Sequence, residues 1–149
     1  MRSKLTQLLA LGILTFTLSG CSIGGTYYLR NFTSEPAKII LTLSEAGTAI
    51  FEEPTFSYSD ELLKIRRNLY KKLENSTSGE FTDKRTLEFE VPAMSTLFLA
   101  IGSNMQMALI ETIRIESISG SELINSDNHE LLNLKMRGIG QYTGHYDIN

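Results

Sequence analysis

Residues 86–101 read TLEFEVPAMSTLFLAI and contain the two clearest strand patterns in the chain. Its first six residues alternate between polar and apolar side chains, which is typical of a half-buried strand. Pro92 ends that strand, because proline has no N–H to donate to a sheet ladder. Residues 96–101 are almost wholly apolar, so they predict a core strand that is buried on both faces.

The same alternation continues on both sides of this stretch. Further strands are predicted at residues 27–32, 37–43, 48–51, 107–117, 132–136 and 142–148, which gives seven or eight strands in all. The strand at 107–117 is expected to carry a bulge near Ile110. Each of the three prolines falls between predicted strands. The expected fold is mainly β, an antiparallel two-layer β-sandwich of the immunoglobulin-like or transthyretin-like kind.

Residues 59–73 have a different period. Ser59 can cap a helix, and at 100° per residue four apolar side chains fall within an arc of about 80°. The apolar face would consist of Leu62, Ile65, Leu69 and Leu73. We therefore expect one inserted amphipathic helix over an edge or open end of the sandwich.

The strongest local charge feature is a basic run within this segment. Its five cations are Lys64, Arg66, Arg67, Lys71 and Lys72. Three interpretations remain open: a solvated helix face, a contact with anionic lipid headgroups, and docking to an acidic protein partner. Arg66 projects into the apolar arc, so it must extend its charged end to water or find an acidic partner.

The first residues have the order of an export signal. Two cations in residues 1–4 precede a mostly apolar run at residues 5–18, which is shorter than the roughly 20 residues that span a bilayer. Leu18-Ser19-Gly20-Cys21 then resembles the lipobox of bacterial lipoproteins. The resemblance covers only residues 1–21. It implies that the signal is removed, that Cys21 carries diacylglycerol through a thioether, and that its new amino group is acylated, as by palmitate.

This resemblance sets the expected domain organisation. Residues 1–20 are a lipoprotein signal peptide, residues 21–25 are the lipidated cysteine and a short tether, and residues 26–149 are the sandwich domain. Each buried methylene contributes about 0.8 kcal/mol, so two or more acyl chains anchor the protein stably. Ser22, where an aspartate would signal inner-membrane retention in enterobacteria, favours the outer membrane, and the domain is expected to face the periplasm.

Composition excludes several function classes. Losing Arg2 and Lys4 with the leader leaves 12 basic and 17 acidic side chains, a net charge of −5, which argues against nucleic-acid binding. Cys21 is the only cysteine, so the sequence offers neither a disulfide nor a cysteine nucleophile. With two histidines in the chain, His129 beside a turn and His145 paired with Asp147 on an exposed face, no metal or cofactor is predicted.

These observations favour a non-enzymatic binding or scaffolding module, held at a membrane by lipid and facing an envelope protein partner, within an envelope or secretion assembly. One alternative is a surface adhesion or glycan-binding lipoprotein that stacks sugars on tyrosines. The candidates for such a platform are Tyr27, Tyr28, Tyr142 and Tyr146. The other alternative is a hydrolase built around His129 or His145, which requires one of them in a pocket near carboxylates or a serine.

Overall fold

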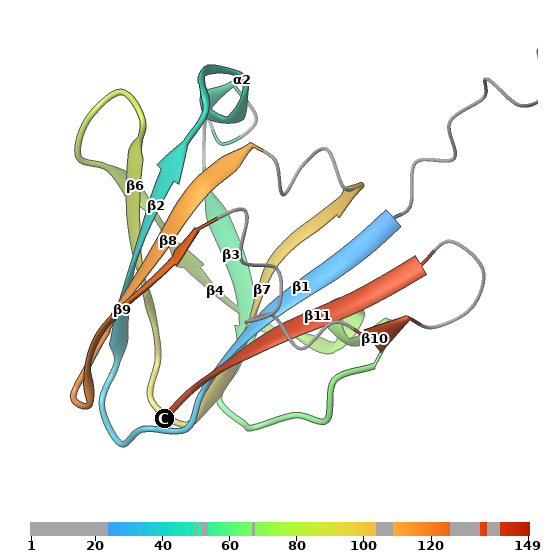
Figure 1. Cartoon of the computed structure of the whole chain (residues 1–149). Coiled ribbons are helices and arrows are strands. Elements are labelled where there is room, and N and C mark those ends of the chain that lie inside the picture. The colour runs from blue at the N-terminus through green and yellow to red at the C-terminus, as the bar shows by residue number, and fades with distance from the viewer. Residues whose placement is uncertain are drawn as a thin grey trace, which may run out of the picture.

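The computed structural model describes residues 24–49, 51, 54–66, 68–103, 109–125, 135–136 and 141–149. Within these residues, strands form two sheets that pack as a β-sandwich (Figure 1). Sheet A has the order β10 (Lys135–Met136), β11 (Gln141–Ile148), β1 (Gly24–Asn31), β7 (Ser95–Ser103), β3 (Thr55–Ser59) and β4 (Asn75–Ser78). Sheet B has the order β5 (Glu80–Phe81), β6 (Thr86–Val91), β2 (Ala37–Leu43), β8 (Ile110–Ser117) and β9 (Gly120–Asn125). The predicted mainly β sandwich is confirmed at this level.

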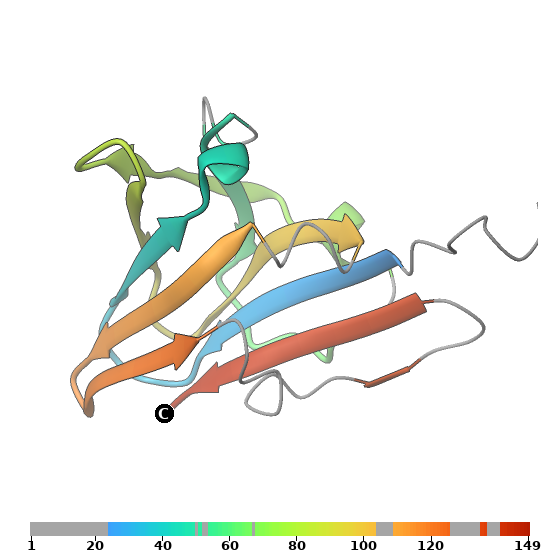
Figure 2. The same cartoon turned by 45° about the horizontal axis from the view of Figure 1, so that its top comes forward.

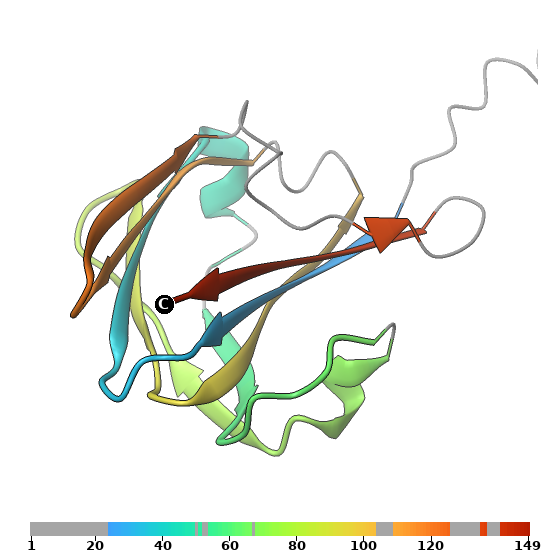
Figure 3. The same cartoon turned by 60° about the horizontal axis from the view of Figure 1, so that its bottom comes forward.

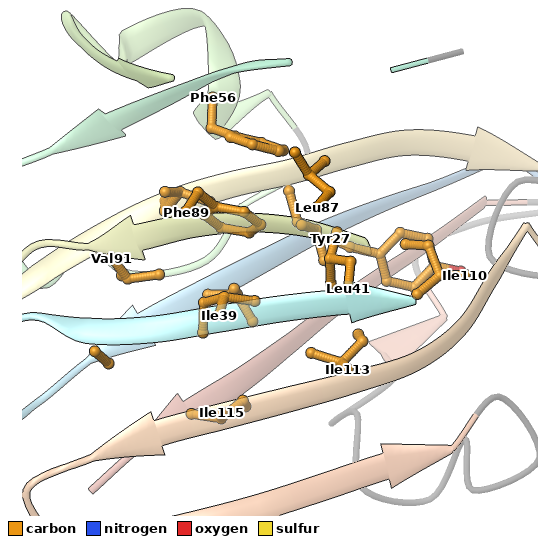
Figure 4. Close-up of a cluster of buried hydrophobic side chains, with 14 of the residues drawn as sticks. Tyr27, Ile39, Leu41, Phe56, Leu87, Phe89, Val91, Ile110, Ile113 and Ile115 are labelled. Atoms are coloured by element: carbon orange, nitrogen blue, oxygen red, sulfur yellow. The ribbon is translucent and has the colours of Figure 1, made fainter. Parts of the chain in front are cut away.

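The core lies between the two sheets, which Figure 2 shows as two layers, and Figure 4 shows the apolar side chains that fill it. In β2 and β6 these side chains come from alternating positions. In sheet B, Ile39 lies opposite Phe89 and Leu41 lies opposite Leu87 in the antiparallel ladder of β2 and β6. Both β2 and β6 have the bounds that the sequence predicts. Burying one such side chain contributes about 1.5–3 kcal/mol, so the alternation fixes which face of each strand turns inward.

Strand β7 is buried on both faces, as its apolar sequence predicts. Leu97 and Leu99 belong to the core between the sheets. On the other face, Thr96 is fully buried and Phe98 packs in a second, smaller apolar cluster. Sheet A is therefore covered on both sides along this strand.

Sheet A is not wholly antiparallel, which corrects the predicted fold. Strands β1 and β11 run parallel, with Gly24 opposite Gln141 and Asn31 opposite Ile148. Parallel neighbours need a long crossover, and here nearly the whole domain separates the two strands in sequence. Alternation within a strand carries no information about the direction of its neighbour, so the sequence pattern could not predict this pair.

The predicted amphipathic helix over residues 59–73 is wrong. No helix is assigned at 60–66, and only Leu69–Lys72 forms a short 3₁₀ helix, η1. We call residues 60–74 the strap, of which residue 67 lies outside the described residues. Figure 3 shows the strap, in green, on the side of sheet A that faces away from sheet B. Its backbone groups bond to side chains of sheet A, described below, instead of to a helical ladder.

Other predicted elements also differ. Of the predicted strand at 48–51, residues 48, 49 and 51 are described, and none of these three is in a strand. Instead α2 (Glu45–Thr48) occupies part of this range, capped by the Ser44 hydroxyl, which accepts a hydrogen bond from the Gly47 N–H at 3.2 Å. Strands β3, β4, β5 and β9 were not predicted, because they are short and each has at most one buried residue, so they lack a strong apolar alternation.

Asn31 joins two connections between the sheets. It is fully buried at the end of β1, and its side-chain amide donates to the backbone carbonyls of Glu35 at 2.8 Å and of Val91 and Pro92 at 3.1 Å each. Its side-chain oxygen accepts from the Thr33 N–H at 3.0 Å and the Thr33 hydroxyl at 2.7 Å. One side chain therefore holds the β1–β2 turn against the β6–β7 turn.

Several predictions concern residues outside the described ranges. These are the signal peptide, the anchor at Cys21, Arg67, His129 and most of the predicted strand at 132–136, of which β10 covers the end. Among the described residues, no helix has the length and apolar character needed to cross a bilayer.

Candidate functional site

The candidate site is the strap, which carries four of the five predicted interaction residues among its described positions. An apolar cluster separate from the main core holds it to sheet A. Ile65 and Leu69 of the strap are buried there against Tyr28 of β1. The Tyr70 ring stacks on Phe98 of β7, with ring centroids 5.4 Å apart and an interplanar angle of 30°. Ile65 and Leu69 thus lie in contact with the sheet, as predicted, although the strap is not a helix.

Two side chains of sheet A bind the strap backbone. The Thr96 hydroxyl donates to the Glu61 carbonyl at 2.9 Å and accepts from the Leu63 N–H at 2.9 Å. The Tyr28 hydroxyl accepts from the Tyr70 N–H at 3.1 Å. Because the ring is buried, the pKa of Tyr28 is raised above its usual range. Sequence reasoning missed these anchors, although the apolar outward face of the 96–101 strand was a signal that something covers it.

The strap encloses a hollow of about 1230 Å³ that is open to solvent. Four cations line it, namely Lys64, Arg66, Lys71 and Lys72. All four are exposed, and within the described part of the chain none forms an ion pair. The Lys71 ammonium lies 5.9 Å from the centre of the Tyr70 ring. Arg66 therefore projects to water, not into the apolar cluster.

Three carboxylates line the same hollow, but at the ends of the strap. Asp60 and Glu61 follow β3, Glu74 precedes β4, and Asp60 accepts a hydrogen bond from the Asn75 amide at 2.7 Å. The cations occupy the residues between these ends. Charge is thus separated along the strap, with the anions at its base and the cations towards its turn.

The predicted pair of His145 and Asp147 lies on one face of β11 but is not exposed. His145 has 13% and Asp147 has 28% of its side-chain surface accessible. Arg30 of β1 binds both oxygens of the Asp147 carboxylate, through Nε at 2.7 Å and a terminal nitrogen at 2.6 Å. His145 Nε2 lies 3.8 Å from Asp147 Oδ1. The carboxylate is held in a bidentate ion pair that ties β1 to β11, which is a structural use of the group.

Other predicted chemistry has little support among the described residues. They contain no group of three histidine, cysteine or acidic side chains that could hold a metal ion, while His129 lies outside them. Tyr27 and Tyr28 are buried, and the Tyr146 hydroxyl donates to Glu122. These three tyrosines therefore do not form an exposed row that could stack on sugars. Burial and the Glu122 carboxylate together raise the pKa of Tyr146 well above its usual range.

Comparisons with protein-family models, curated proteins and solved structures find no match to this chain. No family, activity or partner is therefore inferred for this chain from a similar protein.

Proposed function

We propose that this chain is a bacterial envelope lipoprotein, anchored through lipid on Cys21, whose sandwich is a non-enzymatic binding or scaffolding module. The lipobox residues Leu18-Ser19-Gly20-Cys21 support the anchor. Ser22 supports the outer membrane as its location, with the domain in the periplasm. We also propose that the sandwich belongs to the immunoglobulin-like or transthyretin-like class.

The observation that carries the proposal is the start of β1 at Gly24, three residues after Cys21. Sequence reasoning expected a tether through residue 25, whereas the strand already includes Gly24 and Gly25. Three residues reach about 10 Å at most, so a lipid on Cys21 would hold the sandwich against the headgroups. A domain that functions far from its membrane would need a longer linker.

The position of β1 within its sheet fits a module with a defined orientation. It lies between β7 and β11, and Gly24 is in register with Ser103 on one side and Gln141 on the other. An anchor attached here holds an inner strand of the sheet. The end of sheet A at Gly24 then faces the membrane, and the opposite end, near Asn31, faces away.

The described site favours binding over catalysis. Its hollow is open to solvent and lined by exposed charges, which suits recognition of another charged surface. The described histidine, His145, lies beside an Asp147 carboxylate that Arg30 already holds. A general acid or base would need that group directed at a substrate pocket.

Mass spectrometry of the protein expressed in full from its own start codon tests the anchor. We expect residues 1–20 to be absent and Cys21 to carry diacylglycerol and an amide-linked acyl chain. The Cys21→Ala variant should remain uncleaved, whereas the neighbouring Ser22→Ala variant should be processed normally. An unmodified thiol on Cys21 in wild-type protein would refute the proposal.

Crosslinking in the intact envelope tests the binding module. We expect wild-type protein and a Lys84→Gln variant to capture the same envelope protein, and capture of no envelope protein by either would contradict the binding module. Robust hydrolase or metal-dependent turnover by the purified protein would contradict a non-enzymatic role.

A further inference from the structure

We infer that the cations of the strap form a contact surface for anionic lipid headgroups of the membrane that holds the anchor. This inference rests on the proposed lipid at Cys21. Of the three interpretations of these basic residues that the sequence leaves open, it selects the contact with anionic lipid headgroups.

The attachment points show which way the strap runs. Its first residues, Glu61 and Leu63, are bound by Thr96, which lies opposite Arg30 in the register of β7 and β1. Tyr70 is bound by Tyr28, two residues nearer to the start of β1. Strands rise about 3.3 Å per residue, so the strap advances roughly 7 Å towards the anchored end between these two points. Figure 3 agrees, since the turn of the strap points towards the end of sheet A where β1 begins.

The order of charges along the strap follows the same direction. The base, where β3 ends and β4 begins, holds Asp60, Glu61 and Glu74. This base lies far from Gly24, because Ser59 pairs with Thr96 at the level of Arg30. The cations occupy the part of the strap that extends towards the anchored end. A membrane at that end would therefore meet positive charge first, although the mature chain as a whole carries a net charge of −5.

The energetics suit a lipid surface. The four described cations are exposed and form no ion pair with described residues. Contact with headgroups therefore does not require any of them to leave a described carboxylate. Each cation near an anionic membrane strengthens binding about fivefold. This attraction decays within a Debye length of roughly 8 Å at physiological salt. A tether of at most about 10 Å keeps the domain close enough for the strap to contact the headgroups.

Lysine acylation of the purified lipidated protein tests the contact. The protein is placed in vesicles of phosphatidylcholine alone, or of phosphatidylcholine mixed with phosphatidylglycerol, and labelling of each lysine is followed by peptide mass spectrometry. We expect Lys64, Lys71 and Lys72 to be labelled about fivefold more slowly in the anionic vesicles, consistent with the effect of one cation near the surface. Lys84, an exposed residue between β5 and β6 of sheet B, is the internal control and should not change.

Salt and a variant sharpen the test. Raising the ionic strength should restore the labelling rate of Lys64, because screening weakens the attraction. In a Lys71→Gln/Lys72→Gln variant, Lys64 should lose most of its protection, whereas a Lys84→Gln variant should keep it. Equal labelling of the strap lysines in both kinds of vesicle would overturn the inference. So would protection that occurs in envelope fragments but not in protein-free anionic vesicles, since that result indicates a protein partner.

The same spectra separate this inference from the proposed function. The mass of the peptide that begins at Cys21 reports whether the lipid is present. If the protein is lipidated but its strap lysines are not protected, the lipid contact is refuted and the proposed anchor is still supported. If the peptide that begins at Cys21 carries no lipid, the proposed anchor is refuted, and so is the headgroup contact, which depends on it.

Discussion

Replacing Asn31 with alanine tests how the two sheets are held together at the end of the sandwich far from Gly24. All hydrogen bonds of the Asn31 side chain, to the backbone of Thr33, Glu35, Val91 and Pro92 and to the Thr33 hydroxyl, are lost in this variant. Two of its partners keep another bond. The Thr33 hydroxyl lies 2.7 Å from both Asn31 Oδ1 and the Glu35 carbonyl, so in the variant its single proton is donated to the Glu35 carbonyl. The Pro92 carbonyl accepts from the Ser95 hydroxyl at 2.6 Å.

The Thr33 N–H and the Val91 carbonyl, in contrast, lose a partner in a buried site. Each such loss costs about 1–3 kcal/mol, so we expect Asn31→Ala to lower the free energy of unfolding by about 4 kcal/mol. With an unfolding entropy of about 2.1 cal/mol/K per residue, a domain of about 125 residues would lose roughly 15 °C in Tm.

Urea unfolding and thermal melting, both followed by circular dichroism, measure these changes. Ser34→Ala, at an exposed neighbouring position, is the matched control and should shift the free energy of unfolding by less than about 0.5 kcal/mol. Thr33→Val should fall between the two, because it keeps the backbone bond to Asn31 and loses the hydroxyl bond. A loss below about 1 kcal/mol in Asn31→Ala would refute the assignment of this side chain as the link between the turns.

Three further predictions concern the strap, an ion pair and pH. Tyr28→Phe should cost about 1–2 kcal/mol and speed hydrogen exchange at the Tyr70 amide, which loses its acceptor; unchanged exchange would contradict this role. Asp147→Asn breaks the partly buried pair with Arg30 and should lower the free energy of unfolding, measured in urea, by about 1–2 kcal/mol. Glu111→Gln breaks an exposed pair with Arg85 and should lower it by less than about 0.5 kcal/mol; equal effects would show that burial does not strengthen the first pair. Because the pKa values of Tyr28 and Tyr146 are raised in the fold, their stabilising contribution is complete below the unfolded value of about 10 and is lost as the pH rises through the folded values. Urea titrations at successive pH values should show this fall, and Tyr146→Phe should flatten it; superimposable pH curves for variant and wild type would disprove it.

The strands that sequence predicts best are those with a strong alternation and a shared core. Strands β2 and β6 have the predicted bounds, because Ile39, Leu41, Leu87 and Phe89 can be buried together in only one register. Strands β3, β4 and β9 were not predicted because each has at most one buried side chain and therefore no apolar alternation. Their pairing depends on backbone bonds to neighbouring strands, which leave little trace in side-chain pattern.

The strap shows why an apolar period is not sufficient to predict a helix. Ile65 and Leu69 face the sheet, as the helical pattern required. The backbone groups around them, however, find partners in Thr96 and Tyr28, which are distant in sequence. These partners replace the hydrogen bonds that a helix would provide, so tertiary contacts override the local preference. The basic residues could be chosen from the sequence, whereas their separation from the carboxylates along the strap required the fold.

The parallel pairing of β1 and β11 has a mechanical consequence. A pull on the amino-terminal end of β1 against the carboxyl-terminal end of β11 acts along both strands, because Gly24 and Ile148 lie at opposite ends of the pair. Such a load shears the ladder, so its hydrogen bonds share the force and do not open one after another. Strand β7 holds β1 from the other side and adds a second ladder that must slide. The domain is therefore built to resist tension applied along the line from its first strand to its last.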